Sequence, residues 1–154
     1  MRATPRPLPW PLPEAISAVR QTGELRVVCQ GSSGFWRKAR ARIYSAVVNG
    51  ELDGVRLLSK AGLERMITEQ HNQTELLQER PYHQALGVLL NTPAAVYMGP
   101  NPRAFGHHGI GGSIGFGDPD AKIGFGYSLN KMHSVGDNGP RARRLIDALY
   151  SVVG

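Results

Sequence analysis

The chain has 154 residues, a length that suits one domain with a single core or a piece of a larger domain. Its formal charge of +6 is spread along the sequence, and the densest basic groups fall on predicted helices, so we expect no nucleic-acid partner. A single cysteine, Cys29, excludes an internal disulfide and a cysteine zinc site, and no segment is apolar for long enough to cross a membrane. We therefore expect a cytoplasmic protein without a membrane partner or a cofactor.

The first 30 residues differ in composition from the rest of the chain. Five prolines alternate with other residues between positions 5 and 13, which favours an extended segment over a helix. We interpret residues 1–30 as an amino-terminal arm or linker and residues 31–154 as the folded domain. The oligomeric state is left open.

Two helices are predicted next. Apolar spacing predicts the first over 35–48, ending at Asn49-Gly50. The turn dipeptide Asp53-Gly54 follows, and Ser59 is placed to cap the second helix. The residues expected to face inward are Trp36, Ala39, Ile43, Ala46 and Val47 in the first helix and Leu63, Met66 and Ile67 in the second.

A hydrophilic link is expected over 69–79, followed by strands over 83–90 and 95–98. The stretch from Phe105 to Met132 then holds eight glycines. It predicts two strands joined by a turn at Asp118-Pro119-Asp120. Counting by twos gives each strand one bulky face and one almost bare face. The glycines serve either close packing of a helix or the approach of a substrate.

The last helix begins at Pro140 and carries an apolar stripe that must be buried. The antiparallel strands are the expected surface, with their bare glycine face as one candidate to receive this helix. These elements predict an α+β fold in which the carboxy-terminal helix packs an antiparallel β-sheet.

Several motifs in the sequence do not support a site. His107 and His108 are adjacent on a predicted strand, so their side chains are expected on opposite faces and not on one metal. The glycine run from Gly109 lacks the third glycine of a dinucleotide fingerprint. Ser128 and Lys131 have Ser-x-x-Lys spacing, but they follow a strand, whereas that motif requires a helix.

Three segments together resemble the serine β-lactamase-related family of esterases and penicillin-binding-protein-like hydrolases. They are Ala41-Arg42-Ile43-Tyr44 with Asn49 to Ser59, then Phe105 to Ser113, and finally Arg143 to Tyr150. The resemblance implies a partial β-lactamase or transpeptidase-like fold, a carboxy-terminal portion of the domain. It also implies a small-molecule ester, amide or lactam as substrate.

The family's third motif, Lys/His-x-Gly, matches His107-His108-Gly109. The resemblance therefore assigns His107 to the cationic or hydrogen-bonding position and the backbone N–H of Ile110 to the oxyanion hole. It assigns Gly109, Gly111 and Gly112 to the substrate wall. His108 replaces the small residue usual at the middle position. No Tyr-x-Asn or helical Ser-x-x-Lys motif is found, so we expect a hydrolase fragment that is inactive alone, or a non-catalytic binding or structural module of the same fold.

Overall fold

The computed structural model describes residues 26–30, 34–77, 79–129, 131–132 and 137–153, with side chains described from Lys38 onward. The chain forms one seven-stranded sheet in the order β1-β7-β6-β5-β4-β3-β2. The strands are β1 (Arg26–Gln30), β2 (His71–Glu75), β3 (Arg80–Gln84), β4 (Leu89–Leu90), β5 (Phe105–His108), β6 (Ile114–Asp118) and β7 (Ile123–Tyr127). The helices are α2 (Gly34–Asn49), α3 (Lys60–Met66) and α4 (Gly139–Val153).

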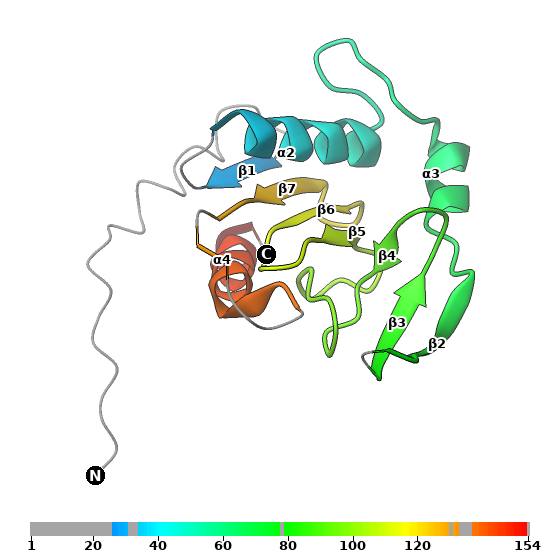
Figure 1. Ribbon diagram of the computed structural model, residues 1–154. Coiled ribbons are helices and arrows are strands. Elements are labelled where there is room, and N and C mark those ends of the chain that lie inside the picture. Colours follow the sequence, from blue (N-terminus) through cyan, green and yellow to red (C-terminus); the bar gives the residue numbers. More distant parts are fainter. Residues whose placement is uncertain (1–25, 31–33, 78, 130, 133–136, 154) are drawn as a thin grey trace.

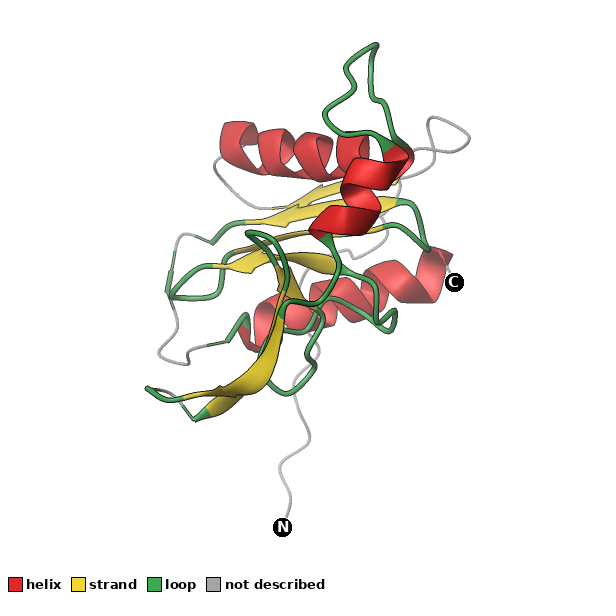
Figure 2. Ribbon diagram, turned by 90° about the vertical axis from the view of Figure 1, so that its right-hand side faces the viewer, coloured by secondary structure: helices red, strands yellow, loops and turns green. Residues whose placement is uncertain are grey.

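The sheet is antiparallel from β2 to β7, and β1 joins its edge parallel to β7. Helices lie on both faces, with α2 above the central strands and α4 below them in Figure 1. Figure 2 shows the same layers from the side, with the β2–β3 ribbon extending away from them. The predicted α+β class with an antiparallel sheet and a packed last helix is confirmed.

The bare face of the glycine strands receives α2, and not α4. A Cβ atom added to Gly124 would lie 2.3 Å from the Ser45 backbone nitrogen and 2.4 Å from the Ala41 carbonyl oxygen. Ala41 and Ser45 are themselves fully buried. Small residues one helical turn apart thus meet glycine on the strand, and the two backbones come into contact. The candidate placement of the last helix on this face is wrong.

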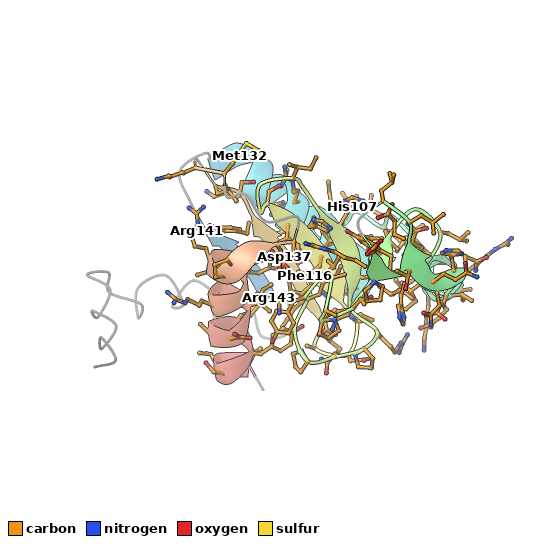
Figure 3. The ribbon with its side chains drawn as sticks, turned by 60° about the horizontal axis from the view of Figure 1, so that its bottom comes forward. His107, Phe116, Met132, Asp137, Arg141 and Arg143 are labelled. Carbon is orange, nitrogen blue, oxygen red and sulfur yellow. The ribbon has the colours of Figure 1, made fainter. Side chains whose placement is uncertain are left out.

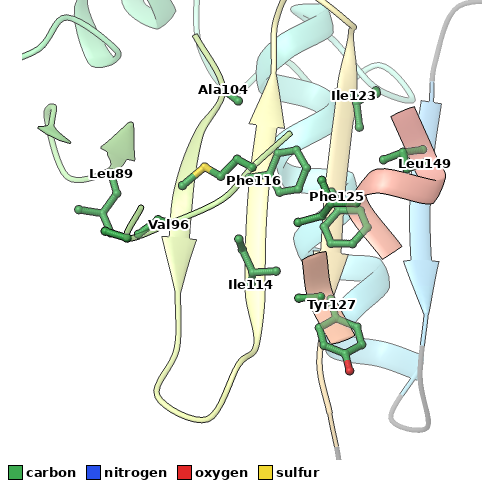
Figure 4. Packing of buried hydrophobic residues seen from close by; sticks show 13 residues of the cluster. Leu89, Val96, Ala104, Ile114, Phe116, Ile123, Phe125, Tyr127 and Leu149 are labelled. Carbon is green, nitrogen blue, oxygen red and sulfur yellow. The ribbon is translucent and has the colours of Figure 1, made fainter. Parts of the chain in front are cut away.

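The bulky face of the same strands packs against α4. Phe116 and Phe125 form the centre of this layer, with ring centroids 5.0 Å apart (Figure 4). Ile146 and Leu149 of α4 are buried against the same cluster. Burial of each such side chain contributes about 1.5 to 3 kcal/mol. The last helix therefore closes the main core, as its apolar stripe predicted.

Asp118, at the end of β6, ties the turn and α4 to the sheet. Its carboxylate accepts hydrogen bonds from the backbone N–H groups of Asp120 and Ala121, at 3.0 and 3.1 Å, and from Asn101 Nδ2 at 2.7 Å. The Tyr150 hydroxyl of α4 also donates to it. A fully buried carboxylate needs such partners. The predicted turn at Asp118-Pro119-Asp120 is confirmed.

The two predicted amino-terminal helices are confirmed, with one correction, and the inward side chain predicted for Trp36 lies outside the described residues. Gly50 has φ +81 and ends α2, and the Ser59 hydroxyl accepts from the Gly62 N–H at 3.0 Å as the cap of α3. Leu63 and Ile67 are buried. Ile43, expected to face inward, is 54% exposed because the inward stripe of α2 runs through Ala41 and Ser45.

Four strand assignments also need correction. The expected strand over 83–90 is divided between β3 and β4, which pair antiparallel through Gln84 and Leu89. The expected hydrophilic link contains β2, whose polar residues pair with β3 at the sheet edge. Residues 95–98 form no strand, since Val96 closes a turn onto Thr92. The first glycine strand is two strands, β5 and β6, separated by a turn over 109–113. A period of two cannot reveal that break, because glycines permit both conformations.

Residues 26–30 of the expected arm form β1, while residues 1–25 lie outside the described residues, so the arm remains a prediction. In the described part of the chain, no helix has the length and apolarity needed to span a bilayer.

Gly124→Ala should lower the free energy of unfolding by at least about 2 kcal/mol, because the new methyl group meets backbone atoms that cannot rotate away. Gly62→Ala in α3 is the control. Its nearest neighbour would be the Ser59 hydroxyl at 3.3 Å, so a change within about 1 kcal/mol is expected. Urea denaturation measures both, and equal stabilities of the two variants would contradict the proposed contact.

Candidate functional site

A cavity of about 420 Å³ opens where α2 crosses the end of the glycine strands. Its lining consists of Arg40, Ile43 and Tyr44 of α2, His107 and His108 of β5, Gly109 and Ser113 of the following turn, and Gly115 of β6. The cavity exists because β6 and β7 carry glycines on this face, at Gly115, Gly117 and Gly124, so that Phe105 and His107 of β5 are the strand side chains that face α2 there. The α2 residues that line it lie near the middle of the helix.

His107 is exposed at the end of β5 and lies in the cavity wall (Figure 3). Strand alternation places it on the same face as Phe105, whose ring packs 5.9 Å from the Tyr44 ring. Its Nδ1 lies 2.6 Å from the His108 carbonyl oxygen. Because a carbonyl only accepts, Nδ1 carries the proton in this contact, and Nε2 of the neutral ring is left as an acceptor. His107 can thus accept or relay a proton at Nε2.

His108 has different surroundings. Its Nε2 lies 3.3 Å from the Tyr82 hydroxyl, and the two rings are nearly parallel with centroids 6.4 Å apart. Tyr82 packs against the core on the α4 side of the sheet, so the partners of the two histidines differ as alternation predicts. Their centroids are nevertheless only 5.8 Å apart, because the His107 ring turns back over the next peptide.

The turn after β5 contains the other residues assigned by the resemblance. The Gly109 N–H donates to the Ser113 carbonyl at 2.7 Å, and the Gly112 N–H donates to the Gly109 carbonyl at 3.1 Å. Gly111 and Gly112 have φ of +93 and +106, values that favour glycine. Gly109 lines the cavity, whereas Ile110, Gly111 and Gly112 lie in the turn outside the cavity lining.

Ile110 occupies the second position of this turn, and its side chain is 90% exposed. Among the described residues, no backbone carbonyl of the turn and no neighbouring side chain accepts a hydrogen bond from the Ile110 N–H. Ile110 follows Gly109, which lines the cavity, and its role as the oxyanion donor stays a prediction.

Sequence reasoning missed the contribution of α2. Tyr44 lies beside Gly115, where an added Cβ would be 2.8 Å from Tyr44 Cε2. Burial raises the pKa of Tyr44, and the Arg40 charge offsets part of that rise. The phenol therefore remains protonated at neutral pH and serves as a hydrogen-bond donor. The small residues on one face of α2, Ala41 and Ser45, could have been matched with the glycine face of the strands. That match would have predicted that α2 lines the site.

The Beta-lactamase family model matches residues 4–150 of the chain. The chain belongs to the Beta-lactamase family. This is a family of β-lactamase-related hydrolases. The first relative below is similar to this chain in sequence, and the two solved structures are similar in sequence and in fold.

Esterase/beta-lactamase LipL of Mycobacterium tuberculosis (strain ATCC 25618 / H37Rv) is 36% identical over 101 residues, covering 63% of this chain and 22% of LipL. The crystal structure of a family VIII carboxylesterase is 38% identical with a TM-score of 0.68, covering 73% of this chain and 30% of that one. A penicillin-binding protein homolog from Caulobacter crescentus is 30% identical with a TM-score of 0.70, covering 98% of this chain and 43% of that one. The chain thus spans less than half the length of each of these relatives.

The stability of this family member should depend on pH through His108. Burial lowers the pKa of its ring, the nearby His107 lowers it further, Arg80 adds a smaller decrease, and Asp137 opposes the shift. Above about pH 6.5 both folded and unfolded chains hold a neutral ring, so His108 has no effect. As the pH falls below this value, the unfolded chain takes up a proton that the folded chain resists, and the free energy of unfolding decreases.

His108→Gln should therefore reduce the loss of stability between about pH 7 and about pH 5, where one proton can change stability by at most about 1.4 kcal/mol per pH unit. Urea denaturation at both pH values measures the slope. A slope that is identical in the variant and the original chain would show that His108 is equally protonatable in both states.

Proposed function

We propose that this chain supplies one wall of the acyl-transfer site of a β-lactamase-related serine hydrolase acting on a small ester, amide or lactam. The observation that carries the proposal is the position of His107 and Gly109 in a cavity shared with Tyr44. This is the segment that matches the family's Lys/His-x-Gly motif. The names of the relatives, an esterase/β-lactamase and a carboxylesterase, support the reaction class.

Each wall residue has a role in this proposal. His107 binds or relays a proton at the leaving group or the nucleophile, using Nε2. The Ile110 N–H stabilises the charge that develops on the carbonyl oxygen of the substrate. Gly109 is the glycine of this wall that lines the cavity, and Gly111 and Gly112 supply the left-handed backbone of the turn that presents it.

The nucleophile is proposed to lie outside the wall. Ser128 has Ser-x-x-Lys spacing with Lys131, yet it follows β7 and its hydroxyl accepts a hydrogen bond from Arg40 Nη1 at 3.1 Å. A guanidinium stays protonated, so this partner of Ser128 cannot remove its proton. We propose that the chain is inactive until a segment carrying a helical Ser-x-x-Lys completes the site.

A non-catalytic module of the same fold is the second candidate. It is favoured by His108, because a large ring stands where the family motif has a small residue. In that case the cavity binds a ligand without converting it.

Addition of an amino-terminal segment of a related hydrolase, in trans or by fusion, should give hydrolysis of a short-chain nitrophenyl ester. His107→Ala should then reduce kcat/KM about tenfold or more, the effect of one positioned polar group. His108→Gly is the matched control, since it restores a small residue, and its rate should be equal or higher.

The chain without the added segment provides the baseline. Intact mass after treatment with a fluorophosphonate should show no adduct there. Stoichiometric labelling at Ser128 would contradict the proposed absence of a nucleophile. Failure of every completed form to hydrolyse the ester, with the fold intact, would favour the non-catalytic module.

Ile110→Pro tests the oxyanion donor in the completed enzyme. Proline removes the N–H and suits the second position of a turn, so the fold should tolerate it. The expected loss in kcat is about a hundredfold to a thousandfold. Ile110→Ala keeps the N–H and should change kcat less than about threefold. Equal rates for the two variants would show that this N–H does not contact the reacting carbonyl.

A further inference from the structure

A second cavity lies at the carboxy-terminal end of α2, where that helix meets α3 and the turn between β6 and β7. Figure 1 shows α3 beyond this end of α2. The cavity has a volume of about 380 Å³ and shares no lining residue with the cavity that contains His107. Its volume is within the range of sites that hold a small molecule.

The buried part of the lining is apolar. Val47 of α2 and Leu63 of α3 line the cavity, and both belong to the hydrophobic cluster that packs these helices against Phe105. Their exposed fractions are only 9% and 6%. A ligand that contacts them removes apolar surface from water, so this part of the cavity suits an apolar group.

The exposed part of the lining is cationic. It contains four basic side chains, those of Arg56, Lys60, Arg103 and Lys122. The Glu64 carboxylate, which also lines the cavity, accepts from Arg103 Nη2 at 2.7 and 2.8 Å, and Asp120 accepts from Arg103 Nη1 at 3.2 Å. In the part of the chain that the structure describes, no carboxylate oxygen lies within 4 Å of the other three cations. Three positive charges without a counter-charge therefore surround an apolar cavity.

Two of these three cations occupy positions that favour other residue types. Lys122 has φ +56, a left-handed conformation that is uncommon outside glycine, asparagine and aspartate. Asn49 Nδ2 donates to its carbonyl at 3.4 Å and helps to hold this conformation. Lys60 is the first residue of α3, where a carboxylate is more favourable than a cation. Residues that oppose a local preference are expected where a function requires them.

Three unpaired cations match a phosphate group better than a carboxylate. A phosphate monoester carries nearly two negative charges at neutral pH and presents three strong acceptor oxygens. Lysine binds phosphate as a point charge, and arginine binds it through its planar fork. The lining therefore suits a phosphate group at the basic opening and an apolar group against Val47 and Leu63.

We propose that this second cavity binds the phosphate monoester of a small apolar molecule, with Arg56, Lys60 and Lys122 around the phosphate group. The site lies at the other end of α2 from the proposed acyl-transfer wall. Its occupation does not depend on completion of that wall, so either proposal can fail without the other.

A different role for these cations is to complement the carbonyl groups at the carboxy-terminal end of α2, where positive charge is stabilising. That role predicts a loss of stability when Lys122 is replaced, and no ligand. Binding and stability measured on the same variant therefore separate the two roles.

The test measures the binding of phenyl phosphate to the full chain by calorimetry at low salt and about pH 7.5, where the probe is mostly a dianion. We expect saturable binding at one site. Inorganic phosphate, which lacks the ring, and phenol, which lacks the phosphate, should each bind at least about tenfold more weakly.

Lys122→Asn should weaken the binding of phenyl phosphate about tenfold, because it removes one charged hydrogen bond. Its stability should be equal or higher, since asparagine adopts the left-handed conformation more readily. Lys60→Gln should weaken binding similarly without changing that turn. Arg144→Gln is the matched control, because it removes an exposed positive charge from α4 on the other face of the sheet, and affinity should change less than about twofold.

The position of the bound probe is measured from amide shifts in nuclear magnetic resonance titrations. Shifts at Gly50 and Lys122 without a shift of the His107 ring are expected. No saturable binding, equal binding of inorganic phosphate, or shifts centred on His107 would each overturn the inference. So would an affinity unchanged in both Lys122→Asn and Lys60→Gln, or a loss in Arg144→Gln as large as theirs.

Discussion

The contact between α2 and the glycines of β6 and β7 is the constraint on which the rest of the structure depends. At Gly124 the strand contacts the backbone of α2 at Ala41 and Ser45. The helix and the strand are so close there that only a glycine fits between them. Gly117 similarly leaves room for Val48. Because the contact at Gly124 involves backbone atoms of α2, it fixes the height of the helix above the sheet. Tyr44 and Arg40 are consequently carried over Gly115, at the end of the sheet where β5 presents His107.

The opposite face of the same strands provides the stability that this arrangement needs. Glycine contributes little packing, so the apolar side chains that alternate with it must form the core. Phe116 and Phe125 do so together with α4, and the buried Asp118 holds Tyr150 of that helix to the turn. Burial and then the hydrogen bond to Asp118 raise the pKa of Tyr150, which keeps the phenol protonated as a donor to the carboxylate. Rigid packing on one face thus supports an open site on the other.

The candidate site combines a fixed part with an exposed part. Arg40 and Tyr44 lie on a helix, and Gly115 lies within the sheet, so their positions follow from packing. His107 ends a strand, and Ile110 extends from a glycine turn into solvent. In the proposed hydrolase this exposed edge meets the segment that carries the nucleophile. The chain belongs to the Beta-lactamase family and spans less than half the length of each relative compared with it.

Local sequence determined the elements whose signals are local. The apolar stripe of α4, the cap at Ser59 and the stop at Gly50 each depend on neighbours within a few residues, and all were predicted correctly. The alternation of bulky and bare positions in β6 and β7 also followed from a period of two. The family resemblance singled out His107 and Gly109, both of which line the cavity.

The tertiary structure decided which helix each face of the sheet receives. Both helices have a face that can be buried, and the apolar pattern alone cannot distinguish them. Backbone contact decides it, because only the small residues of α2 fit against glycine, and the larger residues of α4 need the aromatic face. The place of Arg40 and Tyr44 follows from that choice and not from any motif. The sequence by itself therefore determined the helices, most of the strands and the place of His107 on a strand. Which side chains face His107 across the cavity was decided by how closely α2 packs on the glycine strands.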